Sequence, residues 1–100
     1  MEWLWTWDGT YFGYRQGNSL FSHGGNEAGR FYGDEVYGAD GRYLGELRNG
    51  SRLITNLAKS SRIRSVFAPR IAGSHAARAD YVGYAMLAGY EDFPDPSEFA

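Results

Sequence analysis

A sixteen-residue spacing of turn-forming residues constrains the fold of this chain more than any other feature. Three series share it: Asp8-Gly9, Gly24-Gly25 and Asp40-Gly41; Gly13, Gly29 and Gly45; and Gly17-Asn18, Gly33-Asp34 and Asn49-Gly50. Asp-Gly and Asn-Gly favour type I′ hairpin turns, while Gly-Asn and Gly-Asp suit type II′ turns. Each repeat is therefore expected to be a β-hairpin, and successive hairpins to form an antiparallel all-β meander of four units.

Corresponding positions of the repeats carry similar side chains. The aligned rows are Leu4, Leu20 and Val36; Trp5, Phe21, Tyr37 and Leu53; Phe12, Ala28 and Leu44; and Phe31, Leu47 and Ile63. We expect Trp5 and its row to lie in the core. Glycine inside a strand marks a bulge or a close backbone approach. The glycines at 13, 29 and 45 are therefore expected to lie near one another around a pseudo-four-fold axis.

The fourth repeat is degraded, because Asn56, Leu57 and Ser61 stand where the earlier repeats have the turn aspartate and the glycines. Terminal repeats are often atypical because they cap or close an array. We interpret residues 1–100 as one domain with hairpin repeats over 3–67, including a strand from Ile63 to Phe67. Residues 68–80 are expected to be a loop, and 81–100 a C-terminal segment.

The C-terminal segment is expected to pack back onto the hairpins. Residues 81–93 carry too much apolar surface to be left in water beside a small core: Tyr81, Val82, Tyr84, Met86, Leu87, Tyr90 and Phe93. The surface near Trp3 and Trp7, on the same chain or on a second copy, is its expected place. The sequence leaves open whether residues 76–87 are helical or extended.

These hairpin units, together with the ending from Gly89 to Pro94, resemble the bacterial four-fold beta-flower domain. The likeness covers most of residues 4–66 and, more loosely, 81–94. It implies a compact all-β domain with pseudo-four-fold symmetry, and it implies no catalytic residues because that family is largely uncharacterised. A weaker likeness, over residues 36–42, is to the tyrosine–aspartate repeats of large secreted bacterial shells.

Composition and charge narrow the function classes. The chain has no cysteine, which excludes disulfides and thiolate chemistry. No apolar run approaches the ~20 residues that span a bilayer, and no signal-peptide pattern is apparent, so a cytoplasmic protein is expected. Residues 51–80 carry six basic side chains against Asp80, whereas 81–100 carry four acids and no base. The basic stretch and the acidic tail are expected to lie near each other.

No constellation for catalysis is evident. His23 and His75 are the only histidines, and the aspartates at 8 and 40 lie at turns, where a carboxylate normally accepts a backbone hydrogen bond. A metal site needs several histidines or carboxylates that converge. Since neither these nor a phosphate-binding loop is present, we expect no enzyme activity, no metal and no cofactor.

The favoured hypothesis is a non-enzymatic module for protein binding or self-association through an aromatic surface. Trp3, Trp7, Tyr14 and Tyr32 are its candidate residues. The competing interpretation is that the C-terminal segment covers these aromatic rings.

The alternative function is binding of a small ligand at the symmetric centre, or of single-stranded nucleic acid by a basic stretch. The basic candidates are Arg52, Lys59, Arg62, Arg64 and Arg70. Against this stands a solvated basic face, or pairing of these residues with Glu91, Asp92 and Asp95.

Overall fold

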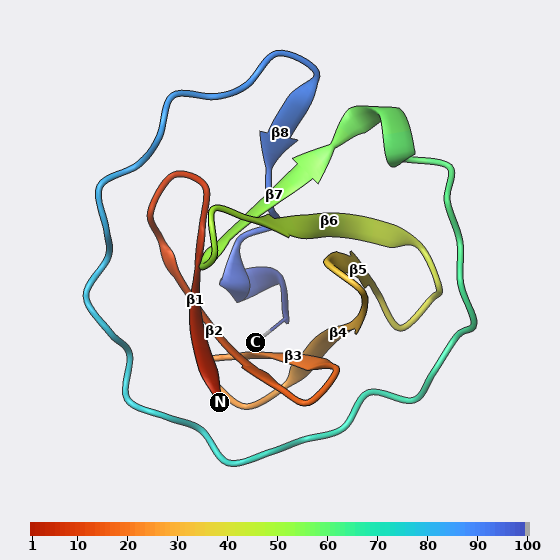
Figure 1. The fold of residues 1–100 in the computed structure, drawn as a ribbon. Helices are drawn as coiled ribbons and strands as arrows, with labels where there is room; N and C mark the ends of the chain where they lie inside the picture. The colour runs from red at the N-terminus through yellow and green to blue at the C-terminus, as the bar shows by residue number, and fades with distance from the viewer. Residues whose placement is uncertain (100) are drawn as a thin grey trace.

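Seven consecutive strands form an antiparallel meander that closes into a barrel in the computed structural model, which describes residues 1–99 (Figure 1). The strands are β1 (Glu2–Thr6), β2 (Tyr11–Gln16), β3 (Ser19–Ser22), β4 (Glu27–Tyr32), β5 (Glu35–Tyr37), β6 (Tyr43–Arg48) and β7 (Arg52–Asn56). The ring closes where β1 pairs in parallel with β7, through Trp5 with Arg52 and Thr6 with Leu53. The predicted all-β hairpin meander is confirmed.

The periodic glycines of the strands allow each strand to approach the next one closely. The first three hairpins share one irregularity, a bulge just after the pairs Leu4–Gly13, Leu20–Gly29 and Val36–Gly45. A Cβ on Gly29 would lie 2.7 Å from Val36 Cγ1 and 2.8 Å from the carbonyl oxygen of Tyr37. For all three glycines the nearest atoms lie on the following strand or on Phe93, not on another of these glycines.

The barrel core differs from the predicted rows at two places. The core cluster contains Leu4, Phe12, Leu20, Ala28, Phe31, Val36, Leu53 and Phe93. Leu53 thus lies in the row of Leu4, although the sequence alignment placed it in the row of Trp5. The reason is that the turn at Asn49 (φ 54°) and Gly50 shifts β7 by one residue. Trp5 is buried, as predicted, but it lies outside this central cluster.

The fourth hairpin is complete but split by an insertion. β7 pairs antiparallel with β6 and also with β8 (Tyr90–Asp92). Ile54 pairs with Asp92 where the first unit pairs Trp5 with Tyr11. Phe93 then occupies the place that Phe12 has in the first unit. The amide of Leu57 donates to the carbonyl of Gly89 (3.0 Å), closing the base of the insertion. The expected continuation of the hairpins to residue 67 was therefore wrong.

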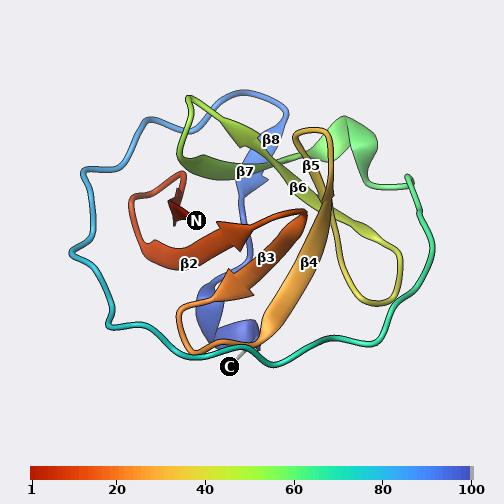
Figure 2. The same cartoon turned by 60° about the horizontal axis from the view of Figure 1, so that its bottom comes forward.

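The insertion forms a belt around the barrel. After the short 3-10 helix η1 (Leu57–Lys59), residues 60–89, here called the belt, encircle the strands as an extended chain (Figures 1 and 2). Its isolated bridges join Ile63 to Arg42 and Ile71 to Asn26. The strand expected over 63–67 is reduced to one of these bridges, and the extended alternative for residues 76–87 is the one observed.

The segment that follows β8 lies inside the ring (Figure 1). Phe93 packs edge-on against Phe12 with ring centroids 5.3 Å apart, and Phe99, from the 3-10 helix η2 (Pro96–Phe99), lies 5.7 Å from the same ring. In Figure 1 this segment lies at the middle of the ring. The prediction that the C-terminal segment packs back onto the hairpins is confirmed, and its aromatic rings fill the symmetric centre.

Candidate interaction surface

The belt is held by the same contacts at three successive repeats of the barrel. The first series of belt amides donates to turn glycines: Arg64 to Gly41 (2.8 Å), Ala72 to Gly25 (2.7 Å) and Tyr81 to Gly9 (2.8 Å). The second series, three residues further along, is Phe67 to Ala39 (3.0 Å), His75 to His23 (3.1 Å) and Tyr84 to Trp7 (3.1 Å). The repeat of the barrel thus imposes a matching period on a segment whose own sequence shows no clear repeat.

The turn glycines are required because the belt crosses directly over them. At Gly25 (φ +93°) a Cβ would overlap the carbonyl oxygen of Ala72 and lie 3.1 Å from the carbonyl carbon of Gly73. Gly9 and Gly41 meet the belt backbone in the same way. Any side chain there would push the belt off the barrel.

A layer of aromatic rings lies between the barrel and the belt. The Trp5 ring stacks on Tyr81 with centroids 3.9 Å apart, and Trp7 packs on Tyr84 at 4.9 Å. The two indole N–H groups donate to belt carbonyls, Trp5 to Ala79 and Trp7 to Ala85, both at 2.9 Å. This layer explains how the chain buries bulky rings that do not fit inside the barrel.

Arg52, which lies between the barrel and the belt, binds the belt at Val82 and Tyr84. Its buried guanidinium donates to the carbonyls of Trp7 (3.2 Å) and Val82 (2.8 Å), and it lies 4.3 Å from the centroid of the Tyr84 ring. Backbone acceptors and an aromatic face can hold a buried cation in this way. Residues 81–84 are therefore fixed in position on the barrel.

The predicted aromatic surface is largely covered. Trp7 is 3% exposed, and Tyr14 is buried with its hydroxyl donating to the Gly73 carbonyl (3.0 Å). Trp3 is half-buried beneath Arg78, whose guanidinium lies 4.0 Å from the indole centroid, and Tyr32 is 39% exposed. The competing interpretation was that the C-terminal segment covers these rings. It applies to Trp7, because Tyr84 and Ala85 lie over that ring.

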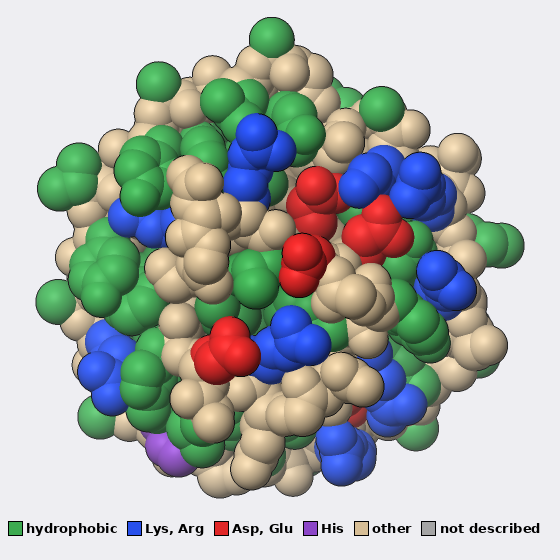
Figure 3. Space-filling view, in the orientation of Figure 1, with side chains coloured by type: hydrophobic (Ala, Val, Ile, Leu, Met, Phe, Trp, Pro, Cys, Tyr) green, Lys and Arg blue, Asp and Glu red, His purple; other side chains and the backbone are tan. Residues whose placement is uncertain are grey.

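Most of the exposed large apolar side chains instead lie on the outside of the belt, which sequence reasoning missed. Ile63, Val66, Ile71, Tyr81, Val82, Tyr84 and Met86 are all exposed. In the space-filling view, hydrophobic side chains protrude around the rim with arginine and lysine side chains between them (Figure 3). The alternation of Val82, Tyr84 and Met86 along the chain was the available signal, because alternate residues of an extended segment share a face.

The basic stretch pairs with glutamates of the hairpins, not with the acidic tail. Lys59 Nζ lies 2.7 Å from Glu46 and 3.0 Å from Glu35, and Arg62 lies 2.7 Å from Glu35. Hydrogen bonding to the two glutamates raises the pKa of Lys59. Arg64 differs from these residues, because it packs on the Tyr32 ring (4.7 Å) and has no carboxylate within ion-pair distance in residues 1–99.

Glu27 joins the belt to β3 and β4. Its buried carboxylate accepts from Arg30 Nε (3.1 Å) and from the amide of Arg70 (3.0 Å). Burial opposes ionisation of Glu27, but hydrogen bonds from Arg30, Ser19 and the Arg70 backbone outweigh it, so the pKa is below the ordinary glutamate value. Glu27 is therefore a structural anion that anchors the belt.

Asp92, at the end of β8, joins that strand to the turn between β1 and β2. Its carboxylate accepts from the amides of Trp7 (2.9 Å), Asp8 (3.1 Å) and Phe93 (2.8 Å). Burial, assisted by the nearby charge of Asp8, raises the Asp92 pKa despite these bonds. The carboxylates of Asp8 and Asp92 thus serve the backbone, and residues 1–99 contain no group of three or more metal-ligating side chains.

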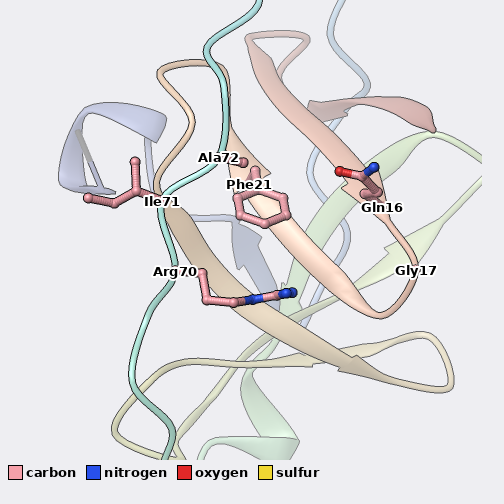
Figure 4. Close-up of a pocket in the computed structure, with 6 residues that line it drawn as sticks. All are labelled: Gln16, Gly17, Phe21, Arg70, Ile71 and Ala72. Carbon is pink, nitrogen blue, oxygen red and sulfur yellow. The ribbon is translucent and has the colours of Figure 1, made fainter.

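A cavity of about 360 Å³ lies between the β2–β3 turn and the belt (Figure 4). It is lined by Gln16, Gly17, Phe21, Arg70, Ile71 and Ala72. Arg70 reaches from the belt toward β3, where it donates to Ser19 Oγ (2.7 Å). The guanidinium is thus already engaged by the protein's own groups.

Comparison with known proteins identifies no relative. No family model matches the chain, and no curated protein or solved structure matches it significantly. In the part of the chain that the structure describes, no helix is long and apolar enough to cross a bilayer.

Proposed function

We propose that this protein is a non-enzymatic binding module that recognises a protein partner through the outer surface of its belt. The observation that carries the proposal is the exposure of apolar belt side chains that lie close together, with Tyr81 51% and Val82 87% exposed. Large apolar patches on a protein surface mark interaction sites. Long loops on rigid scaffolds are also where binding residues concentrate.

The anchoring of the belt supports the same proposal. Backbone hydrogen bonds at three repeats, the stacked tryptophans and Arg52 hold the belt in one extended conformation. Binding to such a preorganised surface avoids the cost of ordering it, which raises affinity for a given contact area. We also propose that the chain belongs to the four-fold beta-flower domains, because a closed barrel of four hairpin units fits that architecture.

The binding function is tested by a photo-crosslinking amino acid placed at Val82 in cells that produce the protein. A control at Asn18, an exposed residue of the β2–β3 turn, reports non-specific crosslinking. A discrete adduct from position 82 that is absent from position 18 is expected. Equal or absent adducts at both positions would overturn the proposal.

A second candidate function, binding of single-stranded nucleic acid, is favoured by one local arrangement. Arg64 stacks on the exposed ring of Tyr32, and Arg30 lies 4.0 Å from the centroid of the Phe67 ring. Arginines interleaved with accessible aromatic rings bind phosphates and stack on bases. Fluorescence anisotropy with a labelled oligonucleotide tests this, because binding must weaken steeply between ~50 and ~200 mM salt. No binding at ~50 mM salt would exclude it.

A further inference from the structure

One short part of the belt differs from the rest by its density of apolar side chains. Tyr81, Val82, Tyr84 and Met86 are 51%, 87%, 48% and 47% exposed, within six consecutive residues. We call these four residues the belt patch. The other exposed apolar side chains of the belt, at 63, 66 and 71, stand singly among arginines.

The belt patch is also anchored to the barrel. Tyr81 stacks on Trp5, Tyr84 packs on Trp7, and Arg52 binds the carbonyl of Val82. Gly83 lies so close to the barrel that a Cβ there would be 2.5 Å from the carbonyl oxygen of Asp8. The patch is therefore a rigid surface that needs no rearrangement to bind.

Charge indicates which partner suits this surface. Arg78 and Asp80, which precede the patch, carry opposite charges, and residues 81–90 contain no ionisable acid or base apart from tyrosine. In a two-fold symmetric contact, a residue near the axis lies beside the same residue of the other copy. Such a contact is therefore tolerated only by a surface whose net charge is close to zero. Within residues 62–70, Arg62 and Arg70 pair with glutamates of the hairpins, but Arg64 has no such partner in residues 1–99 and would oppose its own copy in a self-contact there.

From these observations we infer that the partner is a second copy of this chain, docked patch against patch around a two-fold axis near Val82. This dimer rests on the proposed binding function and identifies the partner that the belt binds. Two half-exposed tyrosines, a methionine and a valine offer on the order of 400 Å² per copy, about half of a standard stable interface. The dimer should therefore be weak, with a Kd of ~10–500 µM.

Sedimentation velocity of the purified full-length chain from ~5 to ~1000 µM tests the inference. The expected result is a sedimentation coefficient that rises toward that of a dimer and is insensitive to salt, because the contact is apolar. Val82→Asp should weaken dimerisation at least ~10-fold, since it places two carboxylates near the axis. Ile71→Asp, the same change at an equally exposed belt residue, should leave dimerisation unchanged; tryptophan emission checks the fold of both variants.

A wild-type chain that stays monomeric to ~1000 µM would overturn the dimer. So would Val82→Asp dimerising like the wild type, or Ile71→Asp weakening the dimer as much as Val82→Asp. The crosslinking experiment separates this failure from that of the proposed function. If the pure chain is monomeric and position 82 crosslinks to a different protein, the dimer is excluded and the binding function stands. The absence of any specific adduct removes the binding function.

Discussion

Replacing Gly25 with alanine, with Gly33→Ala as the control, tests whether the turn glycines hold the belt on the barrel. Both residues have a positive φ, +93° and +64°, but only Gly25 is covered by the belt. A Cβ at Gly33 would meet nothing within 4 Å. The control therefore measures the backbone cost of alanine in the left-handed region without any overlap.

The expected magnitudes follow from these two environments. An L-residue in the left-handed region costs roughly 1–2 kcal/mol, partly offset by about 0.4–1 kcal/mol from the stiffer unfolded chain. Gly33→Ala should therefore lower the free energy of unfolding by about 1 kcal/mol. Gly25→Ala also forces the belt backbone to shift, which adds about 1–3 kcal/mol. The melting temperature of Gly25→Ala should then lie several degrees below that of the control, at about 4–8 °C per kcal/mol.

Urea unfolding and amide hydrogen exchange together read out this prediction. The amide of Ala72, which donates to Gly25 at 2.7 Å, should exchange about 10- to 100-fold faster in Gly25→Ala. The amide of Arg64, which is held by Gly41, serves as an internal reference. Equal destabilisation by the two variants, with unchanged exchange at Ala72, would refute the role of the glycine.

Further predictions concern Glu27, Phe93 and the C-terminal segment. Because the folded-state pKa of Glu27 is lowered, its ionised form should stabilise the fold above the ordinary glutamate pKa, and this contribution should vanish as the pH falls through the lowered value. Melts of Glu27→Gln and wild type should then converge between pH 7 and pH 3; a constant gap would contradict this. Phe93→Ala should cost about 3–5 kcal/mol in urea unfolding, and a wild-type midpoint would show that Phe93 is not a core residue. Truncation after Ala79 should shift tryptophan emission to the red and lower solubility, whereas unshifted emission and melting would make the segment an appendage.

The sequence predicted the hairpins of the first three units because their geometry is set by local turn chemistry. Asp-Gly, Gly-Asn and similar pairs determine strand direction and register over a few residues, and their period survives in the structure. The close approach at Gly29 was also predictable from its place inside a strand. Its nearest neighbour was not, since the sequence does not say which backbone the glycine faces.

The split fourth hairpin could not be predicted by the same reasoning. Leu57 and Ser61 fall at the right period, so a degraded repeat was the direct interpretation. The actual partner of Ile54 is Asp92, on the far side of an insertion that has no local pattern of its own. The belt conformation is imposed by the barrel through contacts distant in sequence, and so the exposed patch around Val82 was missed as well.

The most direct test of this account is a solution NMR measurement of which residues complete the fourth hairpin. The account predicts backbone NOEs between Ile54 and Asp92 and between Thr55 and Glu91, together with contacts from the Phe93 ring to Gly45. Cross-strand NOEs from β7 to residues 57–61 instead would mean that the fourth repeat folds locally. That result would contradict the insertion, and with it the belt.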